Sequence, residues 1–266
     1  NGGYTGYNQN AEGVPSGIDQ QLLFEPPSGY NETVDIQTVL AGPDEYVVAG
    51  RNVAAGRAIV AGFNRIDGEL TWHRDFVSVT AGPVLAGDWM VVGSHDRLHG
   101  VERAADRTEW VKPVAWQSYG GISHLAIQNE SVYVGGHGGS ENEEGSVVVI
   151  GPSSGTVQHS HRMEGVTNLF VTNDHVFAGW YAFFSGGLKV FNRTLNTGYS
   201  LDDATYCPSQ DDDPGWTPRV VANGHVYGFT TEAEELVAYD FNDRTEIWRR
   251  SIKDGTLTRP VVRKDI

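Results

Sequence analysis

The chain has 266 residues, a formal net charge of −15 and a single cysteine, Cys207. The length is enough to bury a sizeable core, and the surplus of carboxylates argues against nucleic acid as a partner. A lone cysteine excludes an intrachain disulfide and a multi-thiolate metal site, and no apolar run is long enough to span a bilayer.

The chain begins at Asn1, and no basic and apolar leader follows it, which indicates a mature or trimmed sequence. A membrane tether upstream of Asn1 remains compatible with this start. Residues 1–19 are rich in Gly, Asn and Ser, so we expect a flexible N-terminal lead. Residues 21–25 read as an outer strand without the strands that would normally precede it.

An acidic or glycine turn followed by a β-rich run recurs along the chain. The turn positions lie 42 to 50 residues apart, at Asp44, Asp88, Glu130, Asp174 and Gly224. A short apolar run precedes each turn, and two further β-rich runs follow it. We name these four runs strands A, B, C and D. Four short strands at a period of about 44 residues predict the blades of a β-propeller.

The fold class that we expect is all-β, with residues 20–266 forming one propeller domain of four-stranded antiparallel blades. The repeats lie near 34–76, 79–114, 121–163, 166–201 and 217–252, with a partial unit over 255–266. Residues 21–25 and 257–262 are interpreted as strands D and A of one closing blade. Either the chain is a fragment of a seven- or eight-bladed ring, which we favour, or it is a small ring of five or six blades.

The third and fourth runs of each repeat resemble the repeat of the PQQ-like (quinoprotein alcohol dehydrogenase-like) propeller family, L-x-A-x-D-x-x-x-G-x-x-x-W. Residues 236–248 match this pattern best, and the resemblance covers roughly residues 20–266. It implies that Trp72, Trp110 and Trp248 pack between neighbouring blades as docking tryptophans. Gln158 or His159, and Ser200, hold that position in the other two repeats.

The long connections of this meander all join B to C or D to A, so we expect them on one side of the disc. Function concentrates on loops that a rigid scaffold holds, although such insertions are also tolerated without any role in binding. Our candidate binding face comprises six residues from these connections and the adjoining strand ends: His137, Trp180, Tyr181, Phe183, Phe184 and Trp216.

Metal sites are weakly indicated. Asp211, Asp212 and Asp213 could hold Ca²⁺ through carboxylate oxygens, but they lack the spacing of a calcium loop, and a solvated acidic run is the better interpretation. His159 with His161, and His95 with His99, each lack a third ligand. The chain has no nucleophile elbow, zinc-protease motif, phosphate loop or dinucleotide fingerprint, so we predict no catalytic residues.

Three functions remain open. The one we favour is a non-catalytic module that holds a protein partner or a surface polymer. The second, a PQQ-dependent dehydrogenase, is implied by the family resemblance; its relatives hold the quinone with an adjacent-cysteine disulfide and calcium ligands that we cannot match here, so we expect no PQQ or other cofactor. The third is a glycan-binding propeller that uses Trp116, Trp180 or Trp216 as a sugar platform.

Composition and sequons indicate the compartment. Four of the 19 basic residues are lysine, and an acidic, lysine-poor surface suits concentrated salt, where charge is screened over a few ångströms. We therefore expect a non-catalytic, haloarchaeal-type family member, extracellular or on the cell surface of a high-salt archaeon. The N-glycosylation candidates are Asn31, Asn129 and Asn192.

Overall fold

The computed structural model describes residues 34–52, 56–103, 107–113, 121–137, 144–182, 185–200, 216–230 and 235–251. Every helix or strand assigned within these residues is a β-strand, numbered β1 to β19 along the chain. In this part of the chain no helix is long and apolar enough to cross a membrane.

Three sheets are separate antiparallel meanders of four strands, which we call blades 1, 2 and 5. Blade 1 consists of β1 (Val34–Ala41), β2 (Glu45–Asn52), β3 (Arg57–Asn64) and β4 (Leu70–Phe76). Blade 2 consists of β5 (Ala81–Ala86), β6 (Trp89–Ser94), β7 (Arg97–Glu102) and β8 (Arg107–Pro113). Blade 5 consists of β16 (Trp216–Ala222), β17 (His225–Thr230), β18 (Glu235–Asp240) and β19 (Thr245–Ser251).

The fourth sheet has seven strands and contains two blades that share one strand. Blade 3 is β9 (Ile122–Gln128), β10 (Ser131–His137), β11 (Glu144–Ile150) and the first half of β12 (Val157–Val171). Blade 4 is the second half of β12 with β13 (His175–Ala182), β14 (Ser185–Asn192) and β15 (Gly198–Ser200).

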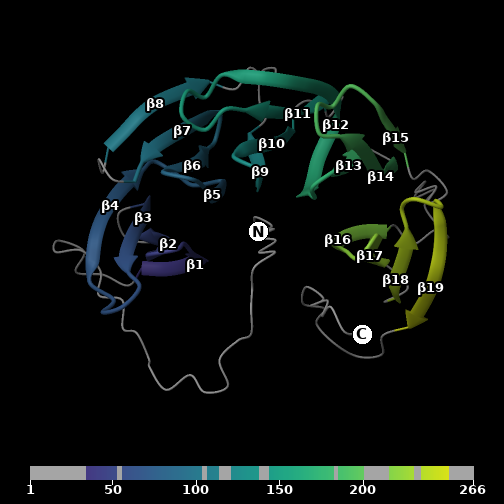
Figure 1. Ribbon diagram of the computed structural model, residues 1–266, viewed down its shortest axis with the longest axis horizontal. Helices are drawn as coiled ribbons and strands as arrows, with labels where there is room; N and C mark the ends of the chain where they lie inside the picture. Colours follow the sequence, from purple (N-terminus) through teal and green to yellow (C-terminus); the bar gives the residue numbers. More distant parts are fainter. Residues whose placement is uncertain are drawn as a thin grey trace.

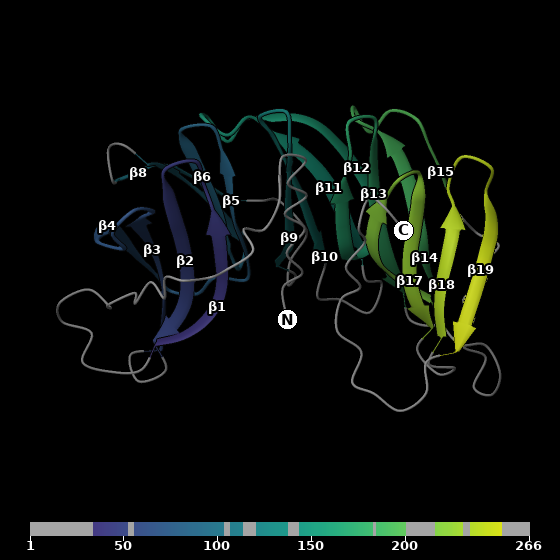
Figure 2. The same cartoon turned by 60° about the horizontal axis from the view of Figure 1, so that its bottom comes forward.

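The five blades stand side by side in an arc, with each strand A near the centre and each strand D at the outside (Figure 1). The tilted view shows the strand axes of successive blades roughly aligned, with neighbouring strands pointing in opposite directions (Figure 2). The predicted fold class, an all-β propeller of four-stranded antiparallel blades, is therefore confirmed. The described residues form an open arc and not a closed ring, and the expected closing strands, 21–25 and 257–262, lie outside them.

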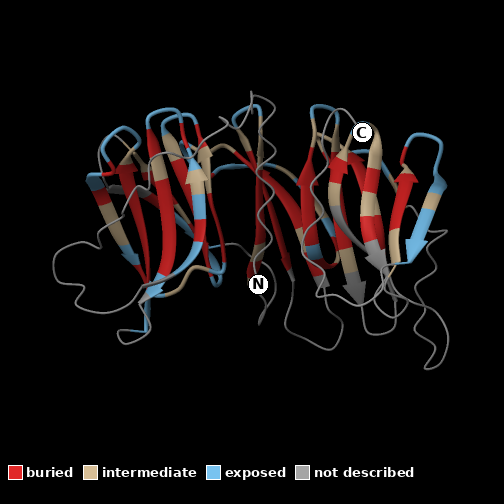
Figure 3. Cartoon of the chain, turned by 90° about the horizontal axis from the view of Figure 1, so that it is seen from below, coloured by how far each residue is buried: buried red, intermediate tan, exposed pale blue. Residues whose placement is uncertain are grey.

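The hydrophobic core consists of layers between neighbouring blades. Val60 of blade 1 and Val92 of blade 2 share one cluster, and Tyr133 of blade 3 and Val176 of blade 4 share another. Because side chains alternate across a strand, each blade presents apolar residues to a neighbour on both faces. Figure 3 shows the result, buried strand centres with exposed turns along one rim.

The repeats expected near 121–163 and 166–201 correspond to blades 3 and 4, and one strand joins these two blades without a loop. β12 continues straight through, pairing with β11 up to Glu164 and with β13 from Gly165 onward. The backbones approach closely here, since a Cβ on Gly145 would lie 2.4 Å from the Gly136 carbonyl oxygen and 3.0 Å from the Gly165 Cα. Glycine at these positions lets one strand serve both blades without a loop.

The meander gives the arc two faces. The A–B and C–D turns lie on one side, which we call the turn face. The B–C and D–A connections lie on the other, which we call the connection face. A–B turns are tight: in blade 3, Asn129 and Glu130 have φ of 47° and 59°, the left-handed values that two-residue hairpins require.

Candidate protein-interaction face

Hydrogen bonds from aromatic side chains tie the outer strand of one blade to the next blade. Trp110 on β8 is 8% exposed, and its indole N–H donates to the carbonyl of Pro152, in the C–D turn of blade 3, over 2.8 Å. The ring lies against Gly100 of the neighbouring strand, where a Cβ would come within 2.0 Å of it. Trp110 therefore joins blades 2 and 3 while it covers its own blade.

Blade 4 makes the same contact with a tyrosine. In blades 1, 2, 3 and 5, strand D carries a bulge just before the docking position, and β15 carries none. Tyr199, and not Ser200, therefore faces Val190 at this position. Its hydroxyl donates to the Phe241 carbonyl in the C–D turn of blade 5 over 2.6 Å. The Arg244 guanidinium stacks 4.0 Å from the ring centroid.

The other docking positions differ in their surroundings. In blade 3, His159 and not Gln158 faces Val149 of the neighbouring strand. In blade 5, Trp248 is partly buried, and its ring centroid lies 6.2 Å from that of Tyr227.

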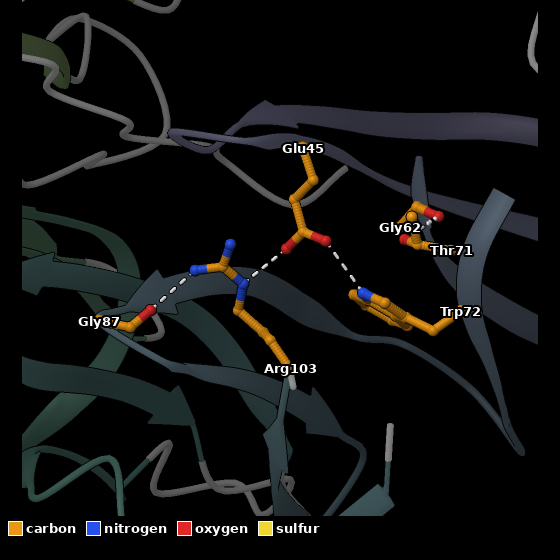
Figure 4. A network of polar contacts seen from close by, with 6 residues as sticks. All are labelled: Glu45, Gly62, Thr71, Trp72, Gly87 and Arg103. Carbon is orange, nitrogen blue, oxygen red and sulfur yellow. Dashed lines mark hydrogen bonds and ion pairs between the residues drawn. The ribbon is translucent and has the colours of Figure 1, made fainter. Parts of the chain in front are cut away.

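Trp72 of blade 1 takes part in a polar network that crosses to blade 2 (Figure 4). Its indole N–H donates to Glu45 Oε2 over 3.0 Å, and Arg103 Nε donates to Glu45 Oε1 over 2.5 Å. A second guanidinium nitrogen of Arg103 donates to the Gly87 carbonyl over 2.8 Å. Glu45 is only 8% exposed, so the pair satisfies a carboxylate that would be costly to bury alone.

A similar cation recurs between blades 3 and 4. Arg193 follows strand C of blade 4 as Arg103 follows strand C of blade 2, and its Nε donates to the Tyr133 hydroxyl over 3.2 Å. Arg103, Arg193 and Tyr199 were not among the residues predicted from the sequence. Aligning the residue that follows each strand C would have indicated the two arginines. The role of Tyr199 could be recognised only from the register of β15 against β14, which the sequence does not show.

The candidate binding residues that the structure describes lie at strand ends on the connection face. His137 ends β10, Trp216 begins β16, and Trp180 and Tyr181 lie near the end of β13. Strands B end on this face and strands A begin on it, so the topology places all four on one rim. Phe183, Phe184 and the aspartates Asp211, Asp212 and Asp213 lie outside the described residues.

Trp180 is partly buried and packs against the core layer between blades 3 and 4. Its indole lies beside Gly187 on β14, where a Cβ would come within 3.0 Å of Nε1. Lys189 Nζ lies 5.4 Å from the ring centroid, a cation–π arrangement. The Trp180 Nε1 atom is buried and has no hydrogen-bond acceptor among the residues that the structure describes.

Charged groups surround this tryptophan. Lys189 Nζ and Glu164 Oε2 form a 2.7 Å ion pair. Burial opposes ionisation of Glu164, but the hydrogen bond and charge of Lys189 outweigh it and lower the pKa of that carboxyl. Burial, and then the Lys189 charge, also lower the pKa of His161, whose ring centroid lies 4.6 Å from that of Phe191 on β14.

Two histidines pack against aromatic rings of the neighbouring blade. His161 lies on Phe191, and His99 lies edge-on to Phe76 with 5.2 Å between ring centroids. Burial and the charge of Arg97 lower the pKa of His99. No three His, Cys, Asp or Glu side chains gather as metal ligands in the described part of the chain. With one cysteine in the whole sequence, these residues do not fit a calcium-bound quinone held by an adjacent-cysteine disulfide, and we derive no chemistry through one.

Two of the three sequons lie in described turns. Asn129 is exposed in the A–B turn of blade 3. Asn192 ends β14, and its side-chain oxygen accepts hydrogen bonds from the Asn196 amide over 3.0 Å and the Thr194 hydroxyl over 3.3 Å. That oxygen therefore stabilises the C–D turn of blade 4. Asn31 lies outside the described residues.

Comparison with known proteins gives one family. The PQQ-repeat family described as outer membrane protein assembly factor BamB matches residues 56–213, more than half of the chain. A search of curated proteins found no match.

Proposed function

The chain belongs to the PQQ-repeat β-propeller family described as outer membrane protein assembly factor BamB, and from this premise we propose that it is a non-catalytic module that holds a protein partner outside the cytoplasm. The family description is the observation that carries this proposal. The scaffold supports it, because inter-blade hydrogen bonds and ion pairs fix the rims of the blades relative to one another. Such a scaffold suits binding better than a reaction, which needs a set of converging catalytic groups.

We place the partner on the connection face. This rim holds Trp180, whose indole N–H lacks an acceptor within the described part of the chain, and the strand ends at His137, Tyr181 and Trp216. The connections that join strands on this rim include residues 114–121 and 201–215, the two longest between assigned strands. Aromatic residues are enriched in the buried centres of protein interfaces, which favours this rim over the turn face.

Photo-crosslinking from matched positions tests the proposal. Val77 on the connection face and Ile66 on the turn face are 85% and 84% exposed, so they differ in face and hardly at all in exposure. A photoreactive residue at Val77, or at exposed Asp96 of the same face, is expected to capture a discrete protein in cells that make the chain. The same residue at Ile66, or at exposed Asp88, is expected to capture none. Equal capture from both faces, or none from either, would contradict the proposal.

A further inference from the structure

The two described sequons differ in how far the fold uses their side chains. Asn129 is exposed in the A–B turn of blade 3, whereas Asn192 is partly buried where β14 enters the C–D turn of blade 4. Both turns lie on the turn face. An N-linked glycan is bulky and needs an asparagine at the surface, so burial and hydrogen bonding decide between the two sites.

Asn129 lies at the tip of a short hairpin. Asn129 and Glu130 have left-handed φ values, which asparagine tolerates better than most residues, and both are exposed. Directly beneath them, Gln128 pairs with Ser131, the third residue of the sequon. The ladder of β9 and β10 therefore closes below the tip and holds Asn129 above it.

The carboxamide of Asn129 is also oriented. Gln128 Nε2 donates to Asn129 Oδ1 over 3.2 Å and to Asn173 Oδ1, in the A–B turn of blade 4, over 2.6 Å. The oxygen of Asn129 thus faces Gln128 at the boundary between blades 3 and 4. Because the oxygen and nitrogen of an amide point in different directions from its carbon, Nδ2 is directed away from this donor. Nδ2 is the atom that carries an N-linked glycan.

Asn192, in contrast, is committed to its own turn. Its Oδ1 accepts hydrogen bonds from the Asn196 amide and the Thr194 hydroxyl, so the hydroxyl that the acceptor pattern requires is already bonded. Arg193, the middle residue of this sequon, donates from Nε to the Tyr133 hydroxyl of blade 3. A sugar on Asn192 would therefore crowd groups that hold this turn and the neighbouring blade in place.

We propose that Asn129 carries an N-linked glycan and that Asn192 is left unmodified. The donor is a lipid-linked oligosaccharide phosphate. In the transfer, the bond between the sugar C1 and a phosphate oxygen breaks, and the phosphate leaves with its electron pair. C1 then bonds to Nδ2 of Asn129, which gives up one proton to a base of the transferase. This inference rests on the location outside the cytoplasm that the proposed function includes.

The glycan would lie on the turn face, opposite the face to which the proposed function assigns the partner. A bulky, solvated sugar at Asn129 hinders other proteins from packing against this part of the turn face and leaves the connection face open. We therefore expect capture of the partner from Val77, on the connection face, to be unchanged in Asn129→Gln.

Peptide mass spectrometry tests the site on the full chain, exported from a cell that attaches N-linked glycans to exported proteins. We expect the mass of a glycan on peptides that contain Asn129 and the unmodified mass on peptides that contain Asn192. Asn129→Gln and Ser131→Ala should each lose the glycan, and Ser131→Thr, which keeps the acceptor pattern, should retain it. Ser131→Ala leaves Asn129 in place, so its result does not depend on a strained turn.

Each outcome decides the inference. A glycan on Asn129 that Ser131→Ala removes, with Asn192 unmodified, supports it. A glycan on Asn192, none on Asn129, or one that survives Ser131→Ala would overturn it. Because the test imposes export, a missing glycan leaves the proposed function standing. Loss of capture from Val77 in Asn129→Gln would overturn the placement of the glycan away from the partner. If no partner binds the connection face of a chain glycosylated at Asn129, the proposed function alone fails.

Discussion

Trp110 and Trp248 hold equivalent positions in their repeats but have different surroundings. Trp110 is nearly buried and donates to a carbonyl of the next blade, whereas Trp248 is partly exposed. We expect Trp110→Phe to lower the free energy of unfolding by about 2–3 kcal/mol, because it removes a buried donor and leaves the Pro152 carbonyl unpaired. Trp248→Phe, the matched control, should cost less than about 1 kcal/mol. Equal losses in urea unfolding would show that the inter-blade bond contributes little.

Tyr199 offers a sharper test, since removing a single oxygen deletes its hydrogen bond to blade 5 and leaves the ring that Arg244 stacks on. Burial raises the pKa of this hydroxyl, so it remains protonated and able to donate at neutral pH. Tyr199→Phe should destabilise the protein by about 1 kcal/mol, and Ser200→Ala should change stability by less than about 0.5 kcal/mol. A larger loss of stability from Ser200→Ala than from Tyr199→Phe would show that Ser200, and not Tyr199, holds the docking position.

His161 and His99 predict how stability depends on pH. Burial lowers the pKa of both groups in the folded chain below their ordinary value of 6.5. The unfolded chain therefore binds more protons as the pH falls below about 6.5, so stability is full above that value and declines below it. We expect the Tm to fall between pH 7.5 and 5.5 (about two pH units). His161→Gln and His99→Gln should each make this fall smaller, and the double variant should make it smallest. A slope unchanged in the double variant would contradict this.

At the scale of the element, the continuous strand β12 depends on close backbone approach. Gly145→Ala would place a Cβ 2.4 Å from the Gly136 carbonyl oxygen, so we expect a loss of about 1–3 kcal/mol from overpacking. Gly151→Ala is the control, because its nearest neighbour, the Gln158 side chain, lies 3.4 Å away. Chemical denaturation should separate the two. If both variants match the wild type, the blades can move apart at little cost.

The strands could be predicted because each blade repeats the same signals. Asp88 and Asp174 mark hairpin turns between β-rich runs, and this local pattern does not depend on the rest of the chain. The register of strand D could not be predicted, since the absence of one bulge residue in β15 shifts Tyr199 into the docking position. The Glu45–Arg103 pair was missed for a related reason: its partners lie 58 residues apart and meet only when two blades pack.

The candidate face depended only on which connections were long, so its strand ends at His137 and Trp216 could be placed on one rim from topology alone.

At the scale of the whole molecule, the net charge of −15 repels itself in dilute buffer. At 1 M salt the screening length falls to about 3 Å, which weakens this repulsion in the compact state. We therefore expect the Tm to rise more with sodium chloride up to and beyond 1 M (about tenfold above ordinary buffers) than with an equal osmolarity of a neutral sugar, which is excluded from the protein surface but screens no charge. A Tm that falls or stays level with salt would argue against the high-salt environment expected from the composition.

The central claim is that a rigid arc of blades holds a protein on its connection face. Hydrogen exchange of the full chain, alone and with the partner captured from Val77, tests it most directly. We expect slower exchange on the connection face, at Val77–Ala81 and His95–Arg97, and unchanged exchange in the A–B turns at Gly87–Asp88 and Asn129–Glu130. Protection of those turns, with the connection face unchanged, would contradict it.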